Sequence, residues 1–177
     1  MELSMYVACI CEGTAEEVIV SKLLEADRLI FTRDELLENE LIRTRGAVNF
    51  EQRYLRKSYR DKITVLRILD SRREKFRISK AYEHKIAAVH NVITAPEIEI
   101  LIILNEDKYD AYKRSRKKPS DFCKEDLKMS GVKSREFVDR YFSDVNCLIA
   151  AIREYHRVSN IPSGEYSLTD ILKQVNT

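Results

Sequence analysis

Apolar residues in this chain form two kinds of pattern, short unbroken runs and longer segments with helical spacing. The unbroken runs predict strands at residues 5–11, 62–70 and 90–94, because continuous β-favouring apolar residues are typical of strands buried on both faces. A tight turn follows the first run, and helical spacing then predicts a helix from Thr14. Strands that alternate with helices favour a parallel sheet covered by helices.

Helical spacing continues through most of the remaining chain. Further helices are expected at 32–42, 47–59, 81–88, 95–112 (capped by Thr94), 120–129, 134–142, 144–157 and 167–175, with an extended piece at 28–31 and a charged loop at 113–118. The fold class predicted from this order is three-layer α/β, with a small, mostly parallel sheet flanked by helices and a helical C-terminal region. We expect an α/β domain over residues 1–125 and a helical extension over 126–177 that packs on it as one compact unit.

Composition narrows the class of protein. The 177 residues are 44% apolar and include only four glycines and three prolines, which argues against a disordered chain and against an all-β barrel. The longest apolar runs, such as 98–104, which Glu99 interrupts, are too short for a membrane span, and the N-terminus lacks the basic segment of a signal peptide. The four cysteines form no CxxC pair, so structural zinc is not expected. We therefore expect a cytoplasmic protein with no membrane partner.

Acidic residues follow two of the expected strands. Glu12 comes directly after the first strand, Asp70 ends the second, and Glu16 lies one helical turn after Glu12. Functional groups gather at the carboxyl ends of parallel strands, and converging carboxylates suit Mg²⁺ or Mn²⁺ and phosphodiester chemistry. The alternative is structural, because acids in a first helical turn also stabilise the helix dipole. Both interpretations remain open at this point.

Two segments resemble a known family. CEGTAEEVIVSKLL (residues 11–24) resembles the first motif of Toprim domains, and its EGTAE form is most similar to the OLD and RloB-like groups. VITAPEIEILIILNEDKYDAY (residues 92–112) is similar to a block of the RloB-like group. The resemblance covers about residues 5–125 and implies a Toprim-like fold, metal-dependent cleavage or transfer at a phosphodiester, and an association with bacterial anti-phage defence.

The resemblance also implies roles for individual acids. By position, Glu12 matches the family's acid/base glutamate, Asp70 its first metal-binding aspartate, and Glu16 the second glutamate of the EGxxE form. The family usually has Asp-x-Asp after the second strand, whereas here Arg72 stands at the second acid position. Either Glu74 or Glu97 completes the metal site, or Arg72 binds a phosphate directly.

Basic residues are concentrated in three segments, which is a pattern that can hold a nucleic-acid backbone. The candidates for phosphate binding are Arg72 and Arg73, and those for wider nucleic-acid contact are Arg56, Lys57, Lys113, Arg114, Arg116 and Lys117. The alternative is that these residues form ordinary solvated faces, balanced by nearby acids.

The leading functional hypothesis is a Toprim-like, Mg²⁺-dependent nuclease or related phosphodiester enzyme that acts on nucleic acid. The alternative is a catalytically degenerate Toprim-like module that binds a partner protein, such as an ATPase; Arg72 at the second acid position favours it. The sequence leaves open whether the chain forms a homo-oligomer.

Overall fold

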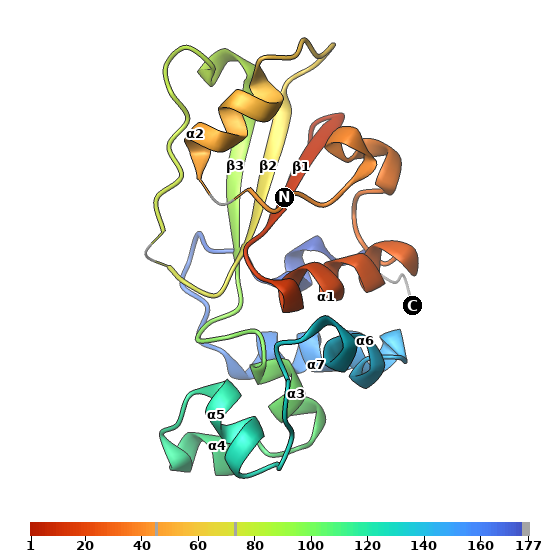
Figure 1. Cartoon of the computed structure of the whole chain (residues 1–177), viewed down its shortest axis with the longest axis vertical. Helices are drawn as coiled ribbons and strands as arrows, with labels where there is room; N and C mark the ends of the chain where they lie inside the picture. Colours follow the sequence, from red (N-terminus) through yellow and green to blue (C-terminus); the bar gives the residue numbers. More distant parts are fainter. Residues whose placement is uncertain (45, 73, 175–177) are drawn as a thin grey trace.

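Three parallel strands form the single sheet of the computed structural model, which describes residues 1–44, 46–72 and 74–174. The strands β1 (Tyr6–Cys11), β2 (Ile63–Leu69) and β3 (Ile86–Ile93) pair in the order β1-β2-β3. All three point toward the helical half of the molecule (Figure 1). The predicted α/β class with a small parallel sheet is confirmed.

Helices occupy most of the rest of the described chain. They are α1 (Thr14–Glu25), α2 (Ala47–Phe50), α3 (Ile100–Asn105), α4 (Tyr109–Ser115), α5 (Pro119–Glu125), α6 (Arg135–Tyr141) and α7 (Val145–Val158). A π-helical turn (Glu51–Leu55) extends α2, and 3₁₀ turns form at Arg33–Glu35, Leu37–Asn39, Glu83–Lys85 and Leu168–Ile171. Within the described residues, no helix has the length and apolar composition needed to cross a bilayer.

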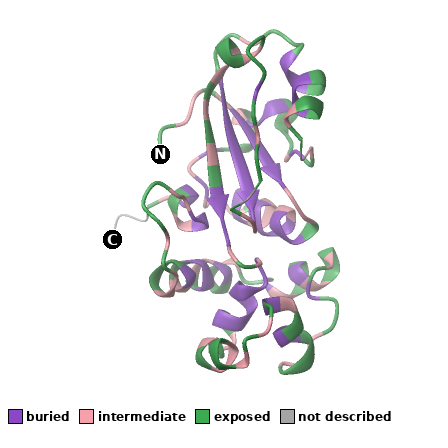
Figure 2. Cartoon of the chain, turned by 90° about the vertical axis from the view of Figure 1, so that its left-hand side faces the viewer, coloured by how far each residue is buried: buried purple, intermediate pink, exposed green. Residues whose placement is uncertain are grey.

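The sheet buries side chains on both of its faces. Val7 and Cys9 of β1 belong to the larger apolar cluster, which includes residues of α1, α3 and α7. Ala8 and Ile10 point to the other face, where they meet a smaller cluster that includes Phe50 of α2. Residues of β1 and β2 are almost all buried, whereas intermediate and exposed residues alternate along β3 as far as Asn91 (Figure 2). Helices on both faces of the sheet give the three-layer arrangement that the sequence predicts.

The larger cluster also contains residues from the C-terminal part of the chain. Leu148 and Ile152 of α7 are buried in it, and α7 packs against α3. One apolar core therefore includes residues on both sides of residue 125. The boundary itself stays a prediction.

The helix expected at 32–42 is wrong. Two 3₁₀ turns occupy this segment, and Glu38 and Asn39 have positive φ angles that end helical geometry. Leu36 and Ile42 form parallel β-bridges with Val7 and Ile10 instead. The apolar residues of this segment therefore cover the free edge of β1.

The remaining differences concern where elements begin and end. The helix expected at 81–88 is wrong, because β3 begins at Ile86 and pairs along the whole of β2. The helix expected at 95–112 begins only at Ile100 and breaks at Asp107, whose φ is positive, and α4 continues to Ser115 within the predicted loop. The helices expected at 47–59 and 167–175 are shorter, since helical geometry stops at Leu55 and at Ile171.

A buried arginine lies inside β2. The side chain of Arg67 is 2% exposed; it donates hydrogen bonds to Glu74 Oε2 (3.0 Å) and Asn91 Oδ1 (3.3 Å). Its guanidinium carbon lies 4.8 Å from the ring centroid of Phe76. These contacts hold the segment that follows β2 against the face with the smaller cluster. Glu74, one of the acids proposed to complete the metal site, is therefore bonded to Arg67.

Candidate functional site

A pocket of about 340 Å³ lies at the carboxyl ends of β1 and β2. We call it the acidic pocket. Its lining is Glu12, Gly13, Thr14, Ala15, Glu16, Asp70, Glu99 and Lys133. Because β1 and β2 are parallel, the acids that follow them reach the same edge of the sheet. The pocket thus brings together Glu12, Glu16 and Asp70, as the sequence predicted.

The turn from β1 into α1 places Glu16 against the backbone. Gly13 is the residue before the helix, and a Cβ at this position would collide with a carboxylate oxygen of Glu16. The absence of a side chain at Gly13 therefore lets the carboxylate fold back over the turn. Glu16 is only 6% exposed. Its neighbour Glu17 points elsewhere and pairs with Arg43 and Arg135.

Glu99 is the acid that the sequence analysis missed. It is the residue before α3, and its side chain is 3% exposed. Burial raises the pKa of Glu99 to about 7, and the negative charges of Glu97 and Glu16 add to this effect, whereas Lys133 opposes it. A carboxyl group with this pKa can hold or release a proton near neutral pH.

Glu97, the predicted metal ligand on this segment, does not line the acidic pocket. Its carboxylate accepts hydrogen bonds from the Ser120 backbone N–H (2.9 Å) and from Lys133 Nζ (3.1 Å). Burial alone would raise the pKa of Glu97, but these hydrogen bonds and the charge of Lys133 lower it. Glu97 therefore remains ionised and anchors Lys133 beside the pocket.

Lys133 is the second residue that the sequence analysis missed. It lies between α5 and α6, directly before the helix-capping residue Ser134. Its Nζ is 3.1 Å from Glu97 Oε1 and 3.9 Å from Glu99 Oε2. Burial lowers the pKa of Lys133, but the hydrogen bond to Glu97 and the charges of Glu99, Glu97 and Asp70 raise it overall. The acidic pocket thus holds one permanent positive charge.

Neither of the predicted phosphate-binding arginines, Arg72 and Arg73, is found in the lining of the acidic pocket within the described residues. Arg72 Nε donates to both carboxylate oxygens of Glu165, at 2.9 and 2.8 Å. This ion pair is separate from Glu12 and Asp70, so Arg72 does not fill the acidic pocket. Arg73 lies outside the described residues.

The other predicted nucleic-acid contacts fall into two separate places. Arg56 and Lys57 follow the helical turn after α2, whereas the basic residues at 113–117 belong to α4 and the segment after it. Figure 1 shows α2 and α4 at opposite ends of the molecule. Arg56, Lys113, Arg114 and Arg116 are exposed, whereas Lys57 pairs with Glu38 and Lys117 with Glu125 and Asp126. The two groups therefore do not form one continuous basic surface.

The donor chemistry of the acidic pocket suits a hard divalent cation. Carboxylate oxygens are the ligands that Mg²⁺ and Mn²⁺ prefer, and Mg²⁺ commonly takes one or two carboxylates and keeps several waters. Among the described residues, no group of three or more His, Cys, Asp or Glu side chains is spaced to hold a metal ion.

Comparisons with known proteins add no relative. No protein-family model, no curated protein and no solved structure matches this chain.

Proposed function

We propose that this protein is a Toprim-like, Mg²⁺- or Mn²⁺-dependent phosphodiester enzyme, in particular a nuclease. The observation that carries the proposal is the convergence of Glu12, Glu16, Asp70 and Glu99 on one pocket at the carboxyl edge of a parallel sheet. The resemblance to the RloB-like group supports a cytoplasmic role in bacterial anti-phage defence.

In this proposal each residue of the acidic pocket has a separate role, which depends on its surroundings. Asp70 and Glu16 would hold the cation, which when bound supplies positive charge at the transferred phosphoryl group. Glu12 would move the proton of the attacking group. Glu99 has a pKa of about 7, so it can take part in proton transfer near neutral pH. Lys133 Nζ would attract the phosphate, since its charge lies beside the same pocket.

A second candidate function is a binding module without catalysis, the partner being an ATPase or another protein. Lys133 favours it, because an ammonium group beside Glu99 already supplies positive charge where a metal ion would bind. Arg72, which the sequence analysis saw as the cause of degeneracy, pairs with Glu165 instead.

The test is a calorimetric titration of the full chain with Mg²⁺ and Mn²⁺, followed by incubation with single- and double-stranded DNA and RNA. We expect wild type to bind the ions and to cleave at least one substrate. Glu12→Gln should lower the cleavage rate by about 10²–10⁴-fold, the usual contribution of a general acid or base. Asp70→Asn should weaken metal binding. Glu25→Gln is the matched control, because Glu25 is an exposed acid on α1 outside the acidic pocket.

Lys133→Met separates the two candidate functions. If Lys133 acts on the phosphate, the substitution lowers the cleavage rate and leaves metal affinity nearly unchanged. If its ammonium replaces a metal ion, wild type binds no metal at millimolar concentration and Lys133→Met gains binding. Absence of metal binding in both proteins would refute the enzyme proposal.

A further inference from the structure

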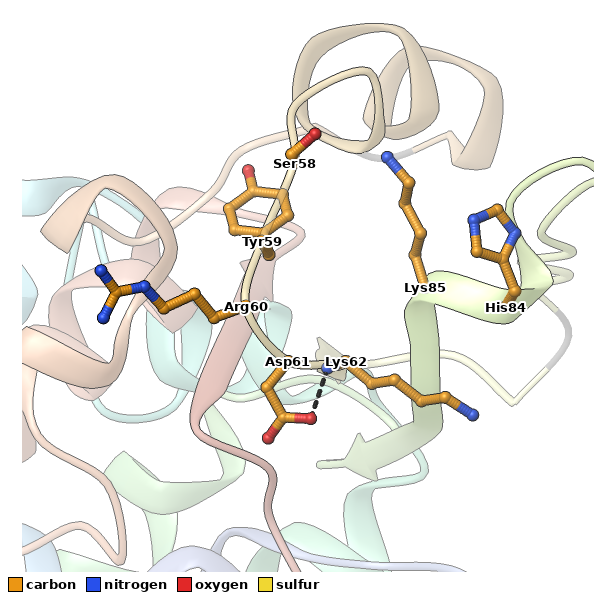
Figure 3. Close-up of a pocket in the computed structure, with 7 residues that line it drawn as sticks. All are labelled: Ser58, Tyr59, Arg60, Asp61, Lys62, His84 and Lys85. Atoms are coloured by element: carbon orange, nitrogen blue, oxygen red, sulfur yellow. Dashed lines mark hydrogen bonds between the residues drawn. The ribbon is translucent and has the colours of Figure 1, made fainter.

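A second pocket of about 340 Å³ lies at the opposite end of the sheet, before β2 and β3 begin. We call it the basic pocket; Figure 3 shows its lining. Ser58, Tyr59, Arg60 and Lys62 come from the segment that enters β2, and His84 and Lys85 from the turn that enters β3. The parallel pairing of Ile63 with Ile86 brings these two segments together.

The wall of the basic pocket is fixed by hydrogen bonds. Lys85 Nζ donates to the backbone carbonyls of Leu55 (2.7 Å) and Lys57 (2.8 Å). An ammonium has three donors, so one remains for a ligand. On the other side, the Tyr59 hydroxyl donates to the Tyr54 carbonyl (3.2 Å). The pocket is therefore built before any ligand arrives.

Positive charge dominates this pocket. Arg60 and Lys62 are exposed, and no ion pair within the described residues involves either side chain. One acid, Asp61, also lines the pocket. Its Oδ1 accepts the backbone N–H of Lys62 (2.7 Å), and Figure 3 shows its carboxylate pointing away from Lys85 and His84. Figure 3 also shows the side chains of Arg60 and Lys62 extending to opposite sides, Arg60 away from Lys85 and His84, so each cation remains available to a separate phosphate.

We propose that the basic pocket binds backbone phosphates of a nucleic acid whose reacting phosphodiester occupies the acidic pocket. The choice of nucleic acid as the ligand rests on the proposed function. The supporting observation is that three exposed cations, Arg56, Arg60 and Lys62, lie in or just before the segment that enters β2. They are more than one phosphate needs, and a nucleic-acid backbone offers several phosphates. A nucleic-acid strand that reached both pockets would have to cross the molecular surface for at least the length of β2, whose seven residues span about 20 Å.

The test compares Arg60→Ala/Lys62→Ala with wild type in the full chain. The probe is a fluorescein-labelled single strand of roughly 20 nucleotides, longer than the sites of most single-strand binding folds. We expect binding to weaken by about tenfold and the slope of log K against log salt to fall by about 1.4, since each lost phosphate contact releases about 0.7 of a counterion on single strands. Lys108→Ala/Lys124→Ala removes the same charge from exposed sites elsewhere and should change neither quantity.

Hydrolysis of bis(p-nitrophenyl) phosphate, a phosphodiester too small to reach both pockets, is measured on the same proteins. If strand binding falls and this hydrolysis is unchanged, both proposals hold. If wild type hydrolyses nothing but strand binding still depends on Arg60 and Lys62, the inference holds and the proposed function fails. If both double variants bind the strand like wild type, the inference is overturned. Calorimetric binding of inorganic phosphate that is tighter than strand binding would also overturn it.

Discussion

The acidic pocket and the basic pocket are similar in size and lie at opposite ends of the same sheet, yet their charges differ in exposure as well as in sign. In the acidic pocket, Glu16 and Glu99 are almost fully buried. In the basic pocket, Arg60 and Lys62 are exposed. Buried carboxylates acquire shifted pKa values, whereas exposed cations act through salt-dependent attraction. One end therefore suits proton and metal chemistry, and the other suits docking of a polyanion.

This difference is invisible in the charge of the whole chain. The formal net charge is only +2, since 31 basic residues nearly balance 29 acidic ones. The parallel sheet separates the charges of the two pockets, because Glu12 and Asp70 follow β1 and β2, whereas Arg60 and Lys62 precede β2 and Lys85 precedes β3. A near-neutral composition is therefore compatible with two oppositely charged pockets.

The largest expected effect comes from replacing the buried acid Glu99 of the acidic pocket by a neutral side chain. The pKa of Glu99 rises from its usual value to about 7 on folding. Below its unfolded pKa both states are protonated, and the shift has no effect on stability. Above it, the unfolded chain releases the proton first, so stability falls as pH rises until the folded pKa is passed. Glu99→Gln should therefore stabilise the protein by about 3 kcal/mol near pH 8 and by little near pH 4.

Urea unfolding across this pH range measures the effect. Glu25→Gln, on an exposed acid of α1, should show no such pH-dependent gain. An equal gain for Glu99→Gln at low and high pH would contradict the assignment of the raised pKa. On the proposed function, added Mg²⁺ should reduce the gain at high pH, since a cation bound in the acidic pocket would stabilise the ionised Glu99 of wild type.

At the basic pocket, Lys85 is the one lining cation that we expect to matter for stability. Lys85→Met removes two charge-assisted hydrogen bonds to the carbonyls of Leu55 and Lys57 and should cost about 2 kcal/mol. The matched change Lys62→Met, at an exposed cation with no ion pair within the described residues, should stay within about 0.5 kcal/mol. Urea unfolding at neutral pH compares the two. Equal costs would mean that the wall of the basic pocket is not held by Lys85.

The sequence predicted one pocket much better than the other. The two strands that precede Glu12, Glu16 and Asp70 are easily recognised as continuous apolar runs. Parallel pairing of these strands was then enough to predict that the acids lie close together. Glu99 was missed because it was counted as an interruption of an apolar run; a charge inside such a run is the signal that could have found it. No sequence pattern pointed to Lys133. It is distant in sequence from the other residues of the acidic pocket and reaches that pocket only through the packing of α6.

The basic pocket could not be predicted from local sequence, because it depends on how distant segments pair. A helix was predicted at 81–88, whereas only a short 3₁₀ turn ends at Lys85, and the pairing of β2 with β3 imposes strand geometry from Ile86 onward. Arg67 is a second example. From the sequence alone an arginine is expected to be exposed, and its burial depends on hydrogen bonds to Glu74 and Asn91, which come from other segments. Partners that come from other elements decide whether a charge is buried.

The smallest expected effect concerns how Lys133 is held beside the acidic pocket. Ser134 caps α6 by accepting the Phe137 N–H (3.2 Å), and Asp144 caps α7 by accepting the Asn146 N–H (2.8 Å). Ser134→Ala and Asp144→Ala should each cost about 1 kcal/mol in urea unfolding. Only Ser134→Ala frays the turn next to Lys133. It should therefore weaken the attraction that lowers the pKa of Glu99, and NMR titration should show that pKa rising. If Asp144→Ala shifts the pKa of Glu99 equally, Lys133 is not positioned by its helix cap.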